Sequence, residues 1–150
     1  MNRPDLNTLA KEVCEQNNLD RNGLRQFLQI LQIIELNQRP RLHLNLKGDW
    51  YFDIENGDKR EEYREIKPFY DRTFDEFGYV KIKGVSYHAT EILVCFSNGY
   101  ATDRPQMYWT LSNLAIAQGK EKWGAKEGIE YYTLYLDEDV TDKVQPNTPD

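Results

Sequence analysis

The segment Asn56–Lys67 constrains the fold more than any other, because it packs eight charged residues into twelve positions. Gly57 suits a turn, and the chain after it becomes extended. In a strand, residues two apart share a face, so Glu62 and Arg64 stand side by side as an opposite-charge pair. A regular strand beginning at Lys59 would point that side chain to the other face. We therefore expect a turn or bulge at Lys59.

The flanking segments predict a chain of short strands with one early helix. Residues 41–46 alternate apolar and polar side chains, which indicates a strand. Residues 50–55 read as a short helix with Asp49 as a cap and Gly57 just past its end. Beyond the charged strand, a loop or single helical turn covers 69–78. Further strands are predicted at 79–83, 89–96, 106–111 and 129–136.

Two helices are predicted at the front of the chain. Apolar residues recur at helical spacing over 5–18, and Asn17-Asn18 ends that pattern. Asp20 can cap a second helix with a wide apolar face, which ends at Arg39-Pro40. An apolar face of this width must be buried. We expect the extension 1–40 to pack on the rest of the chain; a homodimer or a protein partner is the alternative occupant.

The spacing Gly57-x-Lys59-x-x-Glu62-x-Arg64 resembles the signature of the ASCH domain, a relative of the PUA RNA-binding fold. Residues 42–47 resemble the first strand of that family, and residues 50–56 its first helix. The run 62–70 is similar to a subgroup common in phages and their hosts, and 96–100 and 121–125 resemble its later landmarks. The resemblance covers roughly residues 41–137.

Fold class and domain boundaries follow from the pattern and the resemblance together. Six short, mostly antiparallel strands close best into a small barrel, as in the PUA-like fold. The expected architecture is α+β, a small PUA-like β-barrel of about six strands with an early helix, preceded by two N-terminal helices. The expected domains are the helical extension 1–40, an ASCH domain 41–137 and a disordered acidic tail 138–150.

The resemblance implies that the motif lines a cleft, and it supplies the candidate site residues. Lys59 and Arg64 could hold a phosphate or a carbonyl oxygen, with Arg64 binding in bidentate fashion. Glu62 could accept a hydrogen bond from a base amine, or act as a general base. The alternative is a solvated strand edge with weak surface ion pairs. The full set of candidate ligand-binding residues is Gly57, Lys59, Glu62, Tyr63, Arg64, Lys67, Tyr100 and Trp123.

Three function classes compete. The first is binding of RNA or a modified nucleotide, with aromatic side chains for stacking, although each aromatic could be ordinary core. The second is a hydrolase with Lys59 and Glu62 as catalytic residues, since some ASCH relatives hydrolyse acetylated cytidine and some cleave RNA. The amidohydrolase pattern has threonine at the position of Glu62, so its Lys-Thr pair is absent. The third is an interaction protein that binds a partner through the helices and the tail.

Charge and composition restrict the partners. The net charge is −6, of which residues 130–150 carry −5, so the body is nearly neutral. A local basic groove is allowed, but a long polyanion-binding stripe is not indicated. Cys14, Cys95, His43 and His88 show no metal-ligand spacing, so neither a metal nor a cofactor is predicted. No apolar run approaches a membrane span, and we expect a cytoplasmic protein with reduced thiols.

Overall fold

The computed structural model describes residues 5–99 and 103–146, and the chain divides into two compact units. One unit takes the residues up to Gln38 together with those from Lys143 onward, and the other is Arg39–Asp142. The charged segment lies in the second unit. Within the described residues, every helix is too short or too polar to span a membrane.

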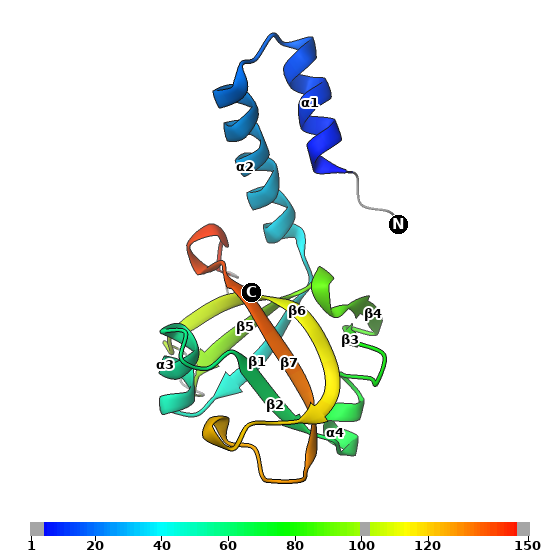
Figure 1. Ribbon diagram of the computed structural model, residues 1–150, viewed down its shortest axis with the longest axis vertical. Coiled ribbons are helices and arrows are strands. Elements are labelled where there is room, and N and C mark those ends of the chain that lie inside the picture. Colours follow the sequence, from blue (N-terminus) through cyan, green and yellow to red (C-terminus); the bar gives the residue numbers. More distant parts are fainter. Residues whose placement is uncertain (1–4, 100–102, 147–150) are drawn as a thin grey trace. The chain divides into compact units, whose positions relative to one another are not determined.

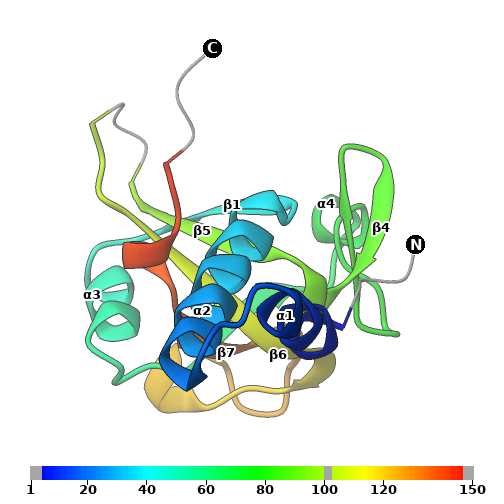
Figure 2. The same cartoon turned by 90° about the horizontal axis from the view of Figure 1, so that it is seen from above.

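The first unit is a helical hairpin, in which α1 (Leu6–Gln16) and α2 (Arg21–Gln38) lie side by side (Figures 1 and 2). Asp5 accepts a hydrogen bond from the Asn7 main chain, and Asp20 accepts one from the Gly23 main chain. These carboxylates satisfy main-chain donors that a helix start leaves unpaired. Both predicted helices and the Asp20 cap are therefore confirmed. The packing of this hairpin on the rest of the chain stays a prediction.

The second unit is built on a five-stranded mixed sheet with strand order β1-β5-β6-β7-β2. Its strands are β1 (Arg41–Leu46), β2 (Glu61–Glu65), β5 (Leu93–Asn98), β6 (Gln106–Gln118) and β7 (Glu130–Asp139). Strand β1 runs parallel to β5, and the other neighbours are antiparallel. The long strand β6 pairs first with β5 and then with β7, and its register shifts let it curve (yellow in Figure 1).

Smaller elements surround this sheet. A separate two-stranded sheet joins β3 (Tyr79–Ile82) to β4 (Val85–His88). Two helices are interleaved with the strands, α3 (Asp49–Glu55) and α4 (Pro68–Asp71). The described residues also contain the 3-10 turns η1 (Ala89–Glu91) and η2 (Glu121–Trp123), and η3 (Thr141–Lys143) follows β7 in the chain.

The core packs on one face of the large sheet. It takes Leu42, Leu44 and Leu46 from β1, Val94 and Phe96 from β5, Met107, Trp109, Leu111 and Leu114 from β6, and Tyr132, Leu134 and Leu136 from β7. Tyr51 and Ile54 of α3 are packed into the same cluster and are almost fully buried. Alternate residues of β1, β5 and β7 supply this face, as the period of two requires, whereas the register shifts in β6 break the alternation between Leu111 and Leu114.

The predicted closed barrel is wrong. The described strands form an open mixed sheet with β1 and β2 at its edges, and β3 and β4 form a separate two-stranded sheet. The helices do not simply precede a barrel either, because α3 and α4 lie between strands. The predicted set of about six strands missed β4, a short and mostly exposed strand. Closure would need main-chain hydrogen bonds between β1 and β2, and these strands pair only with β5 and β7.

The segment expected to be a disordered tail from residue 138 carries the end of a strand and a 3-10 turn up to Lys143. Strand β7 continues to Asp139, and Val140 is buried with its main-chain N–H donating to the Tyr108 oxygen. Val144 is also buried. Burial of two apolar side chains therefore stabilises this segment. The prediction of disorder rested on its acidic charge and did not take these two valines into account.

Candidate functional site

The turn between α3 and β2 sets the position of Lys59. Gly57 has a φ of +86°, a conformation that glycine adopts without steric cost. The main-chain N–H of Lys59 donates to the Asp53 oxygen at 2.9 Å, so Lys59 still belongs to the turn. Strand β2 begins two residues later, at Glu61. The turn predicted at Lys59 is confirmed, and it brings the lysine to the same side as Glu62.

Strand β2 turns two charged residues toward the core. In the antiparallel pair with β7, Glu62 lies opposite Leu134 and Arg64 lies opposite Tyr132. Residues opposite each other share a face of the sheet, and Leu134 and Tyr132 belong to the core. Lys59 is 2% exposed and Glu62 is 6% exposed. A solvated strand edge is therefore not what the structure shows.

Lys59, Glu62 and Arg64 form one ionic cluster, called here the Lys59–Glu62–Arg64 cluster. The Lys59 ammonium lies 2.9 Å from Glu62 Oε1, and Arg64 Nη2 lies 2.8 Å from Glu62 Oε2. One carboxylate thus holds two cations, one at each oxygen. Removing charges from water is costly, and a buried cluster persists only when its members satisfy each other.

Arg64 has partners on several elements. Its Nη2 donates to the main-chain oxygen of Asn45 at 2.9 Å, and its Nη1 donates to the Tyr70 hydroxyl at 3.3 Å. Burial alone would lower the pKa of Arg64, but the charge of Glu62 and the Tyr70 contact raise it above its usual value. Its Nε is buried and has no acceptor among the described residues. A buried donor without a partner is costly, and the oxygen of a ligand or of a water molecule would satisfy it.

Aromatic rings enclose the lysine. The Lys59 ammonium lies 4.3 Å from the centre of the Trp50 ring on α3 and 5.9 Å from that of Tyr63 on β2. A cation over an aromatic face is attracted by the ring quadrupole, more strongly when water is excluded. The ammonium is therefore held by one carboxylate and by the face of Trp50.

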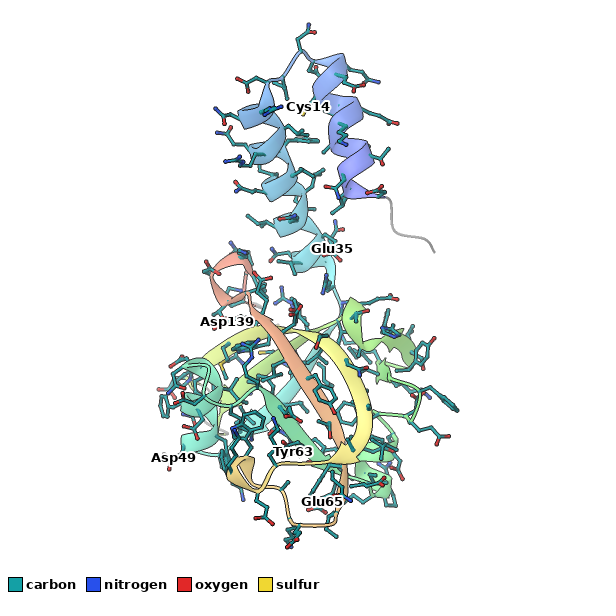
Figure 3. All side chains as sticks on the ribbon, viewed as in Figure 1. Cys14, Glu35, Asp49, Tyr63, Glu65 and Asp139 are labelled. Atoms are coloured by element: carbon teal, nitrogen blue, oxygen red, sulfur yellow. The ribbon has the colours of Figure 1, made fainter. Side chains whose placement is uncertain are left out.

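Residues 119–129, which join β6 to β7, form a wall beside this cluster. The indole N–H of Trp123 donates to the Asp58 main-chain oxygen at 3.0 Å, and the main-chain N–H of Lys120 donates to the Tyr63 hydroxyl at 3.0 Å. Figure 3 labels Tyr63 on β2, beside this wall. Burial raises the pKa of Tyr63 to about 12, against the opposing effect of the Lys120 hydrogen bond.

Gly124 lets the wall approach α3. Its φ is +95°, and a Cβ built there would lie 3.0 Å from Cζ2 of Trp50. A larger residue would therefore be strained by its backbone conformation and would press on the indole that holds Lys59.

These elements enclose a cleft of about 630 Å³ along the free edge of β2. Its lining residues are Asn45, Leu46, Lys47, Gly48, Trp50, Lys59, Glu62, Tyr63, Arg64, Glu65, Tyr70, Gly99, Trp123, Gly124, Lys126 and Tyr131. Four of these are basic and two are acidic, so the lining is positive in a protein of net charge −6. The volume lies in the range of small-molecule sites.

The structure brings together most of the site residues named from the sequence. Lys59, Glu62, Tyr63, Arg64 and Trp123 all line the cleft. Gly57 shapes the turn but is not part of the lining.

Among the described residues, one predicted ligand-binding side chain does not join them. Lys67 lies outside the lining, where it pairs with Glu65 at 3.3 Å and lies 5.5 Å from the Tyr70 ring. Tyr100 lies outside the described residues, so its predicted role stays a prediction.

Sequence reasoning missed Trp50, Tyr70 and Tyr131 as lining residues. Trp50 carried one usable signal, since it is a tryptophan in the first turn of the helix that leads directly into the motif. Tyr131 and Tyr70 reach the cleft from β7 and α4, and no spacing in the sequence links them to the motif.

Within residues 5–99 and 103–146, no three His, Cys, Asp or Glu side chains gather so that they could hold a metal ion. No family model matches this chain, and neither a curated protein nor a solved structure matches it.

Proposed function

We propose that the cleft binds one nucleotide, either a residue of RNA or a modified nucleotide, through the Lys59–Glu62–Arg64 cluster. The observation that carries the proposal is the buried Nε of Arg64, a donor without an acceptor among the described residues, in a side chain that lines a positive cleft. A phosphate or carbonyl oxygen is the acceptor that such a guanidinium binds best.

The other groups suit the remaining parts of a nucleotide. Glu62 uses each oxygen once, and a carboxylate has further lone pairs that could accept from a base amine. The rings of Tyr63 and Tyr70 offer faces for stacking. Lys47 and Lys126 add positive charge to the lining and would attract the phosphate.

The resemblance of the motif to ASCH domains supports the same class of ligand. It implies RNA or nucleotide binding for a chain with this spacing. Hydrolysis of RNA or of a modified nucleoside is the alternative, in which Lys59 and Glu62 would act on the bound ligand. In the structure both groups are engaged with each other at 2.9 Å, which suits binding and positioning more than nucleophilic attack.

The proposal is tested by isothermal titration calorimetry of the full chain at low salt. The titrants are a panel of nucleoside monophosphates and modified nucleosides, and the measured quantity is the binding affinity. Arg64→Lys keeps the charge but loses the planar fork, so it should weaken binding tenfold or more, roughly the loss of one charged hydrogen bond. Glu62→Gln keeps the shape and an acceptor oxygen but loses the charge, so it should spare a hydrogen-bonded contact with a base amine and abolish base catalysis. Arg72→Lys, at an exposed position outside the cleft, is the matched control.

Two results would contradict the proposal. One is the absence of heat and of saturable binding for every member of the panel. The other is a ligand that Arg64→Lys and Arg72→Lys bind equally well. Product analysis of the same mixtures by mass spectrometry would reveal turnover and so favour the hydrolase.

We also propose a cytoplasmic location. Cys14 on α1 and Cys95 on β5 are both buried free thiols. Buried, unpaired cysteines are typical of a reducing compartment. Fractionation of expressing cells, with antibody detection, tests it; recovery with the secreted or membrane fraction would contradict it.

A further inference from the structure

A second aromatic and basic surface adjoins the cleft, called here the Trp123 ledge and made of Lys120, Lys122 and Trp123. The ammonium groups of Lys120 and Lys122 lie 4.5 and 4.6 Å from the centre of the Trp123 ring. Both lysines are exposed, whereas Trp123 is half-buried and also lines the cleft. The ledge is therefore continuous with the site of the Lys59–Glu62–Arg64 cluster.

The ring of Trp123 is held in place before any ligand binds. Its indole N–H is used by the Asp58 oxygen, and the wall at its base is tied to Tyr63 through the Lys120 main chain. The polar edge of the ring is thus satisfied, which leaves its faces for contact with cations or flat groups. A preorganised aromatic face loses little conformational entropy on binding.

The two lysines differ in what balances their charge. Lys120 lies 3.2 Å from Glu61 Oε2, so a carboxylate compensates part of its charge. Lys122 is the exposed middle residue of η2 and contributes an ammonium next to the ring. An ordinary surface explanation is that the lysine stems cover the indole. That explanation accounts for the contacts, but not for the position of the same ring in the wall of a positive cleft.

We infer that the ligand is a single-stranded oligonucleotide, and that the Trp123 ledge binds the nucleotide next to the one in the cleft. The neighbouring base stacks on Trp123, and its phosphate is held by Lys122 and Lys120. An aromatic platform flanked by cations is the usual means of binding a single strand without strong sequence preference. This inference rests on the proposed function, because the first nucleotide must occupy the cleft.

It follows that the cleft and the Trp123 ledge should affect the binding of different ligands. Arg64 should affect every nucleotide ligand, whereas Lys122 should affect only ligands long enough to reach the ledge. Each phosphate contact also adds to the salt dependence of binding, with a slope of roughly −0.7 per contact for a single strand. The length dependence and the salt dependence should therefore be lost together.

The inference is tested by measuring how tightly the full chain binds three RNA ligands: a mononucleotide, a dinucleotide and a single-stranded octanucleotide. Fluorescence anisotropy measures the octanucleotide affinity, and calorimetry measures the affinities of the two short ligands. The octanucleotide should bind about tenfold or more tightly than the mononucleotide, as one added stacked base implies. Lys122→Ala should reduce that gain and lower the salt slope by roughly 0.7, with mononucleotide affinity unchanged. Lys81→Ala, an exposed lysine on β3 outside the lining, is the control of equal charge.

Trp123→Ala should remove most of the gain, and Trp123→Phe, which keeps a ring, should retain part of it. Circular dichroism of both variants shows whether the fold is kept. Equal affinity for all three ligand lengths would overturn the inference and leave the proposed function standing. Equal losses for Lys122→Ala and Lys81→Ala would also overturn it. If no ligand of any length bound, the proposed function itself would fail.

Discussion

Arg64 of β2 donates a hydrogen bond of 2.9 Å to the main-chain oxygen of Asn45 on β1. These strands are the two edges of the five-stranded sheet. A side chain therefore spans the place where a closed barrel would have a ladder of main-chain hydrogen bonds. The cleft exists because that ladder is missing, and the same guanidinium both joins the edges and faces the cleft. Edge strands with inward charges also avoid pairing with other chains.

Replacing Arg64 by lysine should lower the free energy of unfolding by about 1–3 kcal/mol. Lysine keeps the charge, but a single ammonium cannot reach Asn45, Glu62 and Tyr70 together. Chemical denaturation of Arg64→Lys and of the exposed control Arg72→Lys measures the difference. Equal stability of both variants would show that the Arg64 hydrogen bonds between β1 and β2 contribute nothing to the free energy of unfolding.

Truncating Glu62 should be far more costly than truncating its neighbour Glu65. Glu62→Ala leaves Lys59 buried without a carboxylate, which costs about 3–5 kcal/mol when a buried pair is broken. Glu65 is exposed and pairs with Lys67, so Glu65→Ala should stay within about 0.5 kcal/mol of wild type. Urea unfolding compares the two variants of the same strand. Similar losses of unfolding free energy in the two variants would mean that water reaches the Lys59–Glu62–Arg64 cluster freely.

The sequence predicted the local geometry of the charged segment but not its position in the sheet. The alternation of Glu62 and Arg64 and the turn at Lys59 depend on neighbours in the chain, and both were correct. The face that β2 turns inward depends on its register with β7, where Glu62 lies opposite Leu134. That register is a long-range property, so the cluster could be read as a solvated edge. The missing closure between β1 and β2 likewise follows from pairing that no local pattern encodes.

Stability should fall as the pH rises from 10 to about 12. Burial raises the pKa of Tyr51, Tyr63 and Tyr132 from 10.0 to about 12 in the folded chain. Unfolded tyrosines ionise first, so the stability that these neutral phenols contribute is complete below pH 10 and is lost through pH 12. Urea unfolding at stepped pH measures the free energy of unfolding, and phenolate absorbance reports the ionisation of the tyrosines.

Tyr63→Phe should reduce this alkaline loss, because it removes one of the three raised pKa values. The variant also removes the acceptor of the Lys120 main-chain N–H, so its stability at neutral pH should fall by about 1 kcal/mol. Tyr79→Phe, at an exposed position of β3, serves as the control. An unfolding free energy that stayed constant between pH 10 and 12 would contradict the buried state of these phenols.

Gly119→Ala should displace the wall of the cleft. A Cβ at residue 119 would lie 2.5 Å from the Cβ of Ala125 and 2.8 Å from Cζ of Tyr63, so one of these neighbours must shift. Overpacking of this kind costs about 1–3 kcal/mol. The shift also moves Trp123, so octanucleotide binding should weaken more than mononucleotide binding.

The double variant Gly119→Ala, Ala125→Gly separates steric displacement from a general loss of fold. Removing the Ala125 Cβ relieves the shortest contact, whereas Cζ and Cε1 of Tyr63 would still lie 2.8 and 2.9 Å from the new Cβ. The two substitutions act on neighbouring atoms, so their effects should not add. We expect the double variant to recover part of the stability and part of the octanucleotide affinity, as measured by denaturation and anisotropy. If the second substitution instead added its own loss of stability to the first, the close packing of residues 119 and 125 could not be what positions the wall. The Trp123 ledge would then have to be fixed by the hydrogen bonds to Asp58 and Tyr63.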